Sequence, residues 1–118
     1  MVIRWVVLAV AALLAASPVW AHSFLQHASP PAGAELRSAP ASVKIIFTEA
    51  VEPRFSSIEV RDSAGTRVDT GSTYADGTAT ALAVGLSKLP PGTYTVSWRA
   101  ASVDTHKSEG KYTFSVLP

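Results

Sequence analysis

Apolar and polar side chains alternate with a period of two along several short stretches of the chain. In the first of them Val43, Ile45 and Phe47 fall on one face. The stretches with this alternation are residues 43–47, 58–61, 94–100 and 112–116. Such a period is typical of a β-strand that buries one side and exposes the other. Residues 22–118 show no convincing helical period, so we expect a domain built from strands.

Turn-forming clusters rich in Pro, Gly and Asp separate these stretches at short intervals. They lie at residues 30–33, 39–40, 62–65, 76–77 and 90–92. About seven short strands in a segment of this length predict an all-β fold, either an immunoglobulin-like β-sandwich or a related Greek-key barrel. The predicted core side chains are Phe47, Phe55, Tyr94, Val96, Trp98 and Phe114.

The first 21 residues follow a different pattern. Arg4 precedes an unbroken apolar run at 5–16, Ser17 and Pro18 end that run, and residues 19–21 place small side chains at a cleavage site. The run is well short of the roughly 20 apolar residues that span a bilayer. We therefore predict a cleaved secretory signal peptide at residues 1–21 and a mature domain at 22–118.

Composition narrows the function classes. A chain of 118 residues holds one domain, which excludes a Rossmann dehydrogenase or a (β/α)8 barrel. A formal net charge of +1 gives no electrostatic reason to expect nucleic acid. The chain has no Cys, and its one Met lies in the predicted signal peptide. Thiolate chemistry is therefore excluded, and the mature domain lacks the soft ligands that Cu(I) prefers.

The three histidines carry the strongest chemical signal. Cleavage before His22 would free an α-amine beside an imidazole, and these two nitrogens can chelate a metal ion together. Asp104 and His106 are two residues apart, which places both side chains on one side of an extended segment, on or near an inter-strand loop. His27 lies at an odd offset from His22, on the opposite face of a strand, so we expect it not to be a ligand.

The predicted ligand set is one amine, two imidazoles and one carboxylate. In a tetragonal arrangement these donors favour Cu(II), although Zn(II) could use the same donors tetrahedrally. The geometric condition is that the first strand brings His22 beside the loop that carries Asp104 and His106.

The same residues lie in motifs that resemble the CopC family of periplasmic copper-binding proteins. The matching segments are 22–25 (HSFL), 29–33 (SPPAG), 47–49 (FTE), 51–56 (VEPRFS), 91–99 (PGTYTVSWR), 102–106 (SVDTH), Gly110 and 114–116 (FSV). The terminal His combined with W-R-x-x-S-x-D-x-H at 98–106 is the most specific part. The resemblance implies that residues 22–118 form a CopC-like β-sandwich, exported to the periplasm.

The resemblance also implies a site. One Cu(II) per chain would be held by His22, Asp104 and His106, and Glu49, at the end of the F-T-E motif, would lie near the copper, where a carboxylate can orient a ligand. Members with a Met-rich Cu(I) site differ from this chain, so we expect a Cu(II)-only type. The implied role is copper homeostasis, resistance or delivery, with a separate CopD-like permease of the inner membrane as a candidate partner.

Two other functions stay open on the sequence. An exported immunoglobulin-like binding module without a metal role would use the same fold. A copper oxidative enzyme with a histidine brace would also use a terminal His, but such enzymes are typically much longer, and Asp104 would fill a position that oxygen needs. Nothing resembles a nucleophile elbow or a protease signature, so we predict a binding protein without catalytic residues.

Overall fold

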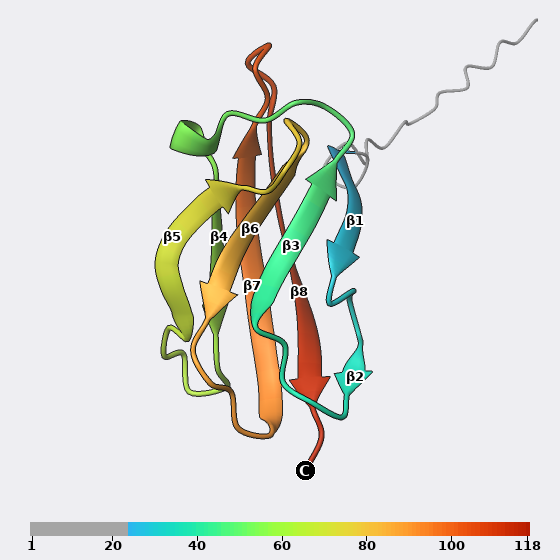
Figure 1. Ribbon diagram of the computed structural model, residues 1–118, viewed down its shortest axis with the longest axis vertical. Helices are drawn as coiled ribbons and strands as arrows, with labels where there is room; N and C mark the ends of the chain where they lie inside the picture. Colours follow the sequence, from blue (N-terminus) through green and yellow to red (C-terminus); the bar gives the residue numbers. More distant parts are fainter. Residues whose placement is uncertain (1–23) are drawn as a thin grey trace, which may run out of the picture.

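Two four-stranded sheets make up the part of the chain that the computed structural model describes, residues 24–118 (Figure 1). The first sheet has the order β1 (Leu25–Ser29), β3 (Ser42–Phe47), β6 (Ala81–Leu86) and β5 (Asp69–Ala75). The second has the order β2 (Glu35–Leu36), β8 (Lys107–Val116), β7 (Gly92–Ala101) and β4 (Ser57–Arg61). All pairs are antiparallel except β2 with β8. The all-β sandwich predicted from the sequence is confirmed, and the four alternating stretches correspond to β3, β4, β7 and β8.

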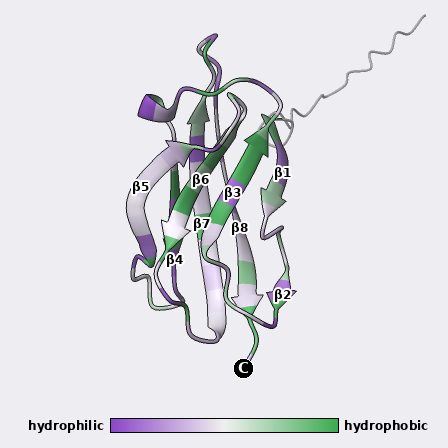
Figure 2. Ribbon diagram, viewed as in Figure 1, coloured by the Kyte–Doolittle hydropathy of each residue, from purple (hydrophilic) through white to green (hydrophobic). Residues whose placement is uncertain are grey.

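The core lies between the two sheets. Figure 2 shows apolar residues concentrated on β3 and β6, in the middle of the first sheet, whereas the edge strand β5 is pale. The aromatic rings at one end of this core are in contact. The centroid of the Phe47 ring lies 5.2 Å from that of Phe24 and 5.4 Å from that of Trp98. Ring pairs at such distances contribute packing energy beyond the area that they bury.

One predicted core residue is wrong. Phe55 is 68% exposed, because it lies outside the strands in a short 3-10 turn, η1 (Pro53–Phe55). Pro53 begins this turn, and the Glu52 side chain caps it by accepting a hydrogen bond from the Arg54 backbone N–H. The other predicted core side chains are buried: Phe47, Tyr94, Val96, Trp98 and Phe114.

Strand β4 is the edge of the second sheet, and side chains from β5 cover its free N–H groups. The Ile58 N–H donates to Thr73 Oγ1 at 3.0 Å, and the Val60 N–H donates to Asp69 Oδ2 at 2.7 Å. An uncovered edge strand is a template for pairing with another chain. These two hydrogen bonds therefore protect the edge and connect the two sheets.

The long β7–β8 hairpin positions the candidate site. Its two strands pair from Gly92↔Val116 to Ala101↔Lys107, and its tip reaches beyond the other strands at one end of the sandwich (Figure 1). Gly110 lies opposite Trp98, where a Cβ atom would come within 2.8 Å of the indole ring. Between residues 24 and 118, no helix combines the length and apolar character that crossing a bilayer requires.

Candidate metal centre

A tight turn at residues 102–106 joins β7 to β8. The Ser102 N–H donates to the His106 carbonyl at 2.8 Å, and the Thr105 N–H donates to the Ser102 carbonyl at 2.9 Å. Thr105 has φ 78°, and no other non-glycine residue between 24 and 118 has a positive φ. The left-handed region is unfavourable for a β-branched residue, so this turn is locally strained. The predicted loop position of Asp104 and His106 is confirmed, but they meet across a turn and not along an extended segment.

A second loop, which runs from β3 to η1, lies against this turn. The Val103 N–H donates to the Ala50 carbonyl at 3.0 Å, and Val51 forms an isolated bridge with Ser102. At its start, the Thr48 N–H donates to the Phe24 carbonyl at 2.8 Å. Backbone hydrogen bonds therefore hold the loop that carries Glu49 between the hairpin and the beginning of β1.

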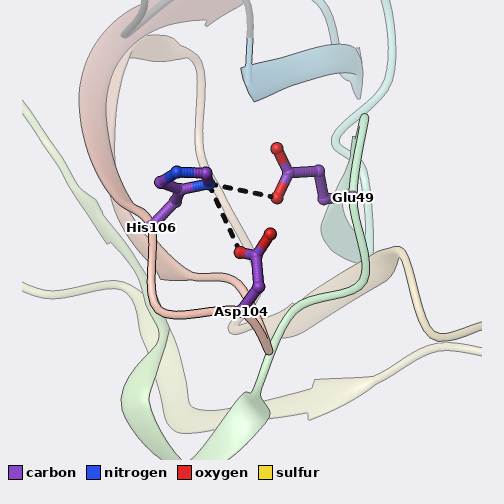
Figure 3. Close-up of side chains that lie close together, drawn as sticks. All are labelled: Glu49, Asp104 and His106. Carbon is purple, nitrogen blue, oxygen red and sulfur yellow. Dashed lines mark ion pairs between the residues drawn. The ribbon is translucent and has the colours of Figure 1, made fainter.

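The side chains of Glu49, Asp104 and His106 converge at this end of the sandwich (Figure 3). His106 Nδ1 lies 3.3 Å from Asp104 Oδ1 and 3.7 Å from Glu49 Oε1. One potential ligand atom from each of the three residues lies within 4.8 Å of the others. The side chains of His106 and Asp104 are 72% and 61% exposed, so the cluster is open to solvent.

Hydrogen bonding stabilises the negative charge of the Asp104 carboxylate. The hydrogen bond from the Ser102 hydroxyl is the main cause that lowers the pKa of the Asp104 carboxyl, and it outweighs the opposing effect of burial. The backbone N–H and imidazole of His106 make smaller contributions that also lower this pKa. Asp104 is therefore a carboxylate at neutral pH. Two carboxylates and one imidazole nitrogen are ligands that divalent first-row metals accept.

The structure places the predicted site residues as follows. Asp104, His106 and the candidate neighbour Glu49 are brought together. His22 lies outside the described residues, as does the predicted signal peptide. His27 lies exposed on β1 and is not a member of the cluster. Ser102, which hydrogen-bonds the cluster, belongs to the motif at 98–106, but the motif alone indicates no role for it.

A β-sandwich with an open cluster of nitrogen and oxygen donors at one end has the form of a small domain that could hold a metal ion. The family model described as "CopC domain" matches residues 25–117, so this chain belongs to the CopC domain family. The resemblance seen in the sequence is thereby confirmed.

Individual relatives agree with this assignment. Protein YobA of Escherichia coli (strain K12) is 40% identical over 100 residues, which cover 83% of this chain and 81% of that protein. Copper resistance protein C of Xanthomonas campestris pv. juglandis is 34% identical over 117 residues, 93% of this chain and 91% of that protein. The crystal structure of CopC from Methylosinus trichosporium OB3b matches with a TM-score of 0.76 and 39% identity, over 82% of this chain and 95% of that one.

Proposed function

We propose that this chain is an exported, periplasmic protein that binds one Cu(II) per molecule for copper homeostasis, resistance or delivery. The observation that carries the proposal is the convergence of Glu49, Asp104 and His106 at the end of the sandwich where β1 begins. The names of relatives agree with it, since one is called a copper resistance protein.

The described part of the chain begins beside the loop that carries Glu49. The Phe24 carbonyl accepts a hydrogen bond from Thr48, the residue before Glu49. His22 precedes Phe24 by two residues, and two residues of chain span at most about 7 Å. Cleavage after residue 21 would therefore leave an α-amine and an imidazole close enough to complete the set with Asp104 and His106.

The donor set selects the ion. One amine, two imidazoles and one carboxylate suit the tetragonal geometry of Cu(II), which also binds most tightly among the divalent first-row ions. Residues 22–118 contain neither Cys nor Met, so they offer no soft ligand to Cu(I). Glu49 Oε1, 3.7 Å from His106 Nδ1, would orient that imidazole rather than bind the ion.

We infer binding rather than catalysis. A carboxylate from Asp104 adds an anionic ligand at a position that an oxygen-activating copper enzyme needs open. The bound copper is then cargo, and a separate CopD-like permease in the inner membrane is the candidate partner that would take it up.

The test is electron paramagnetic resonance of the protein that begins at His22, with one equivalent of Cu(II). We expect an axial signal with nitrogen hyperfine structure. Two changes should abolish this signal: His106→Ala, and a one-residue N-terminal extension that converts the amine into an amide. His27→Ala is the matched control, because it removes an exposed histidine outside the cluster.

An intact mass from the same preparation confirms the N-terminus. A wild-type spectrum like that of unspecifically bound copper would overturn the proposal. An extended protein that keeps the wild-type signal would remove His22 from the ligand set.

A further inference from the structure

Ser102 stands out because it is polar and buried. The whole residue, backbone included, is 4% exposed, and by this measure no other polar or charged residue in the range 24–118 is buried. It lies directly after β7, where the β3–η1 loop covers it through the bridge with Val51. A buried hydroxyl needs hydrogen-bond partners, and its partners show what it holds in place.

Both partners of the Ser102 hydroxyl belong to the metal cluster. Its Oγ accepts a hydrogen bond from the His106 backbone N–H at 3.0 Å and donates one to Asp104 Oδ1. One buried atom therefore contacts the backbone of one candidate ligand residue and the carboxylate of the other.

The two candidate ligands need such a support, since both are exposed. Side chains that are 72% and 61% exposed are free to leave their positions, and holding them in place costs conformational entropy when an ion binds. A hydrogen bond from the buried Ser102 hydroxyl restricts the rotation of the Asp104 carboxylate before the ion arrives.

We propose that Ser102 is a positioning residue of the copper site. Its hydroxyl holds the Asp104 carboxylate in the orientation that meets the ion, and it fixes the backbone from which the His106 imidazole extends. This inference rests on the proposed function of the cluster. It assigns to Ser102 an effect on metal binding beyond its contribution to the stability of the hairpin.

Ser56 provides a matched control in the same chain. Its Oγ donates to the Glu52 carbonyl at 2.8 Å and accepts from the Ala101 backbone N–H at 3.0 Å. Ser56 thus also donates one hydrogen bond and accepts one from a backbone N–H, but its acceptor is a backbone carbonyl and its hydroxyl contacts neither Asp104 nor His106. Removing either hydroxyl should destabilise the metal-free fold, and Ser102→Ala should do so somewhat more, because the Ser102 acceptor is charged.

The experiment compares Ser102→Ala, Ser102→Thr and Ser56→Ala in the protein that begins at His22. Cu(II) affinity is measured by competition with a chelator, the copper environment by electron paramagnetic resonance, and metal-free stability by thermal unfolding. We expect Ser102→Ala to weaken Cu(II) binding about 10- to 100-fold and to change the spectrum, as is typical when a partner of a metal ligand is removed. Ser102→Thr keeps the hydroxyl and should restore most of the affinity, and Ser56→Ala should bind like the wild type.

Whether Ser102 acts on Cu(II) binding through the Asp104 carboxylate is tested by adding Ser102→Ala to an Asp104→Ala background. Most of the effect of Ser102→Ala should disappear there, because no carboxylate remains to be oriented. Wild-type affinity and spectrum in Ser102→Ala would overturn the inference and leave the proposed function standing. An equal loss of affinity in Ser56→Ala would also overturn it, since it would show a general effect of hairpin stability. Failure of the wild type to bind Cu(II) would instead overturn the proposed function.

Discussion

Replacing Asp69 by Asn should destabilise the sandwich more than the position of Asp69 on an edge strand would suggest. The Asp69 side chain is 0% exposed, although it comes from the edge strand β5. Its carboxylate accepts hydrogen bonds from the backbone N–H groups of Val60 at 2.7 Å and Gly71 at 2.8 Å, and from Arg67 Nη2 at 2.6 Å. The bond to Val60 is one of the two that cover the edge of the second sheet.

The expected magnitude follows from these bonds. A hydrogen bond to a charged group contributes about 1.5–3 kcal/mol, and an unsatisfied buried donor costs about 1–3 kcal/mol. Asn keeps one acceptor oxygen but turns an N–H2 group toward the other donors. The Arg67 side chain is 40% exposed, so its ion pair adds little. We expect a loss of about 2–4 kcal/mol, a large share of the roughly 5–15 kcal/mol that stabilises a small domain.

The effect should depend on pH in a defined direction. Burial raises the pKa of Asp69, but the hydrogen bonds from Arg67, Val60 and Gly71 outweigh burial and hold the pKa below its ordinary value. A carboxylate whose pKa is lower in the folded state stabilises the fold above its unfolded pKa, and this contribution is lost as the pH falls through the folded pKa. The difference between wild type and Asp69→Asn should therefore be constant from about pH 7 to 5 and shrink below about pH 4.

Urea unfolding measures this difference, followed by the fluorescence of Trp98, the one Trp in residues 22–118. Asp76→Asn is the control, because Asp76 Oδ2 lies 3.1 Å from Lys44 Nζ in an ion pair with both side chains about two-fifths exposed. Such a pair contributes at most about 1 kcal/mol. The reasoning is refuted if both variants lose the same free energy of unfolding at pH 7, or if the Asp69→Asn difference is as large at pH 3 as at pH 7.

Two further predictions concern the hairpin that carries the site. Gly110→Ala should lower the free energy of unfolding by about 1–3 kcal/mol, because its Cβ would lie 2.8 Å from the rigid Trp98 ring. In Gly85→Ala the added Cβ would meet only the Thr70 side chain, at 3.1 Å, so this variant should lose less free energy of unfolding. Equal urea midpoints for the two variants would contradict the prediction. Thr105→Gly should raise the free energy of unfolding of the metal-free protein by up to about 1 kcal/mol in the same assay, because glycine adopts φ 78° without strain. A clear loss of stability would show that the threonine side chain contributes more than its backbone conformation costs.

The period-two pattern predicted the strands that bury one face and expose the other. It missed β1, β2, β5 and β6, and physical reasons explain the last two. Strand β6 is the central partner of β3 and begins with four consecutive buried residues, while the edge strand β5 has no buried apolar residue, so neither alternates. Phe55 was placed in the core because aromatic residues are usually buried, but the turn that begins at Pro53 removes it from any sheet.

The part of the candidate site that lies within one turn of the chain could be predicted from the sequence. Asp104 and His106 are neighbours in one turn, so their spacing alone indicated a joint site. The approach of Glu49 depends on backbone pairing between distant segments, which no local period reveals; only the family resemblance suggested it. The proposed role of Ser102 could not be predicted either. A serine near a loop is usually exposed, and the burial of Ser102 depends on pairing with the distant β3–η1 loop.

These contacts together explain how an exposed cluster can hold its geometry. The two loops that carry the side chains are fixed to each other by the hydrogen bond from Val103 to Ala50 and by the bond from the Glu52 N–H to the Ala101 carbonyl at 2.8 Å. The carboxylate of Asp104 is tied to a buried hydroxyl. Little ordering of backbone then remains for binding, because potential ligand atoms of Glu49, Asp104 and His106 already lie within 4.8 Å of one another. A site built in this way can stay open to solvent, where an ion can enter and leave, and still present its ligands in a fixed arrangement.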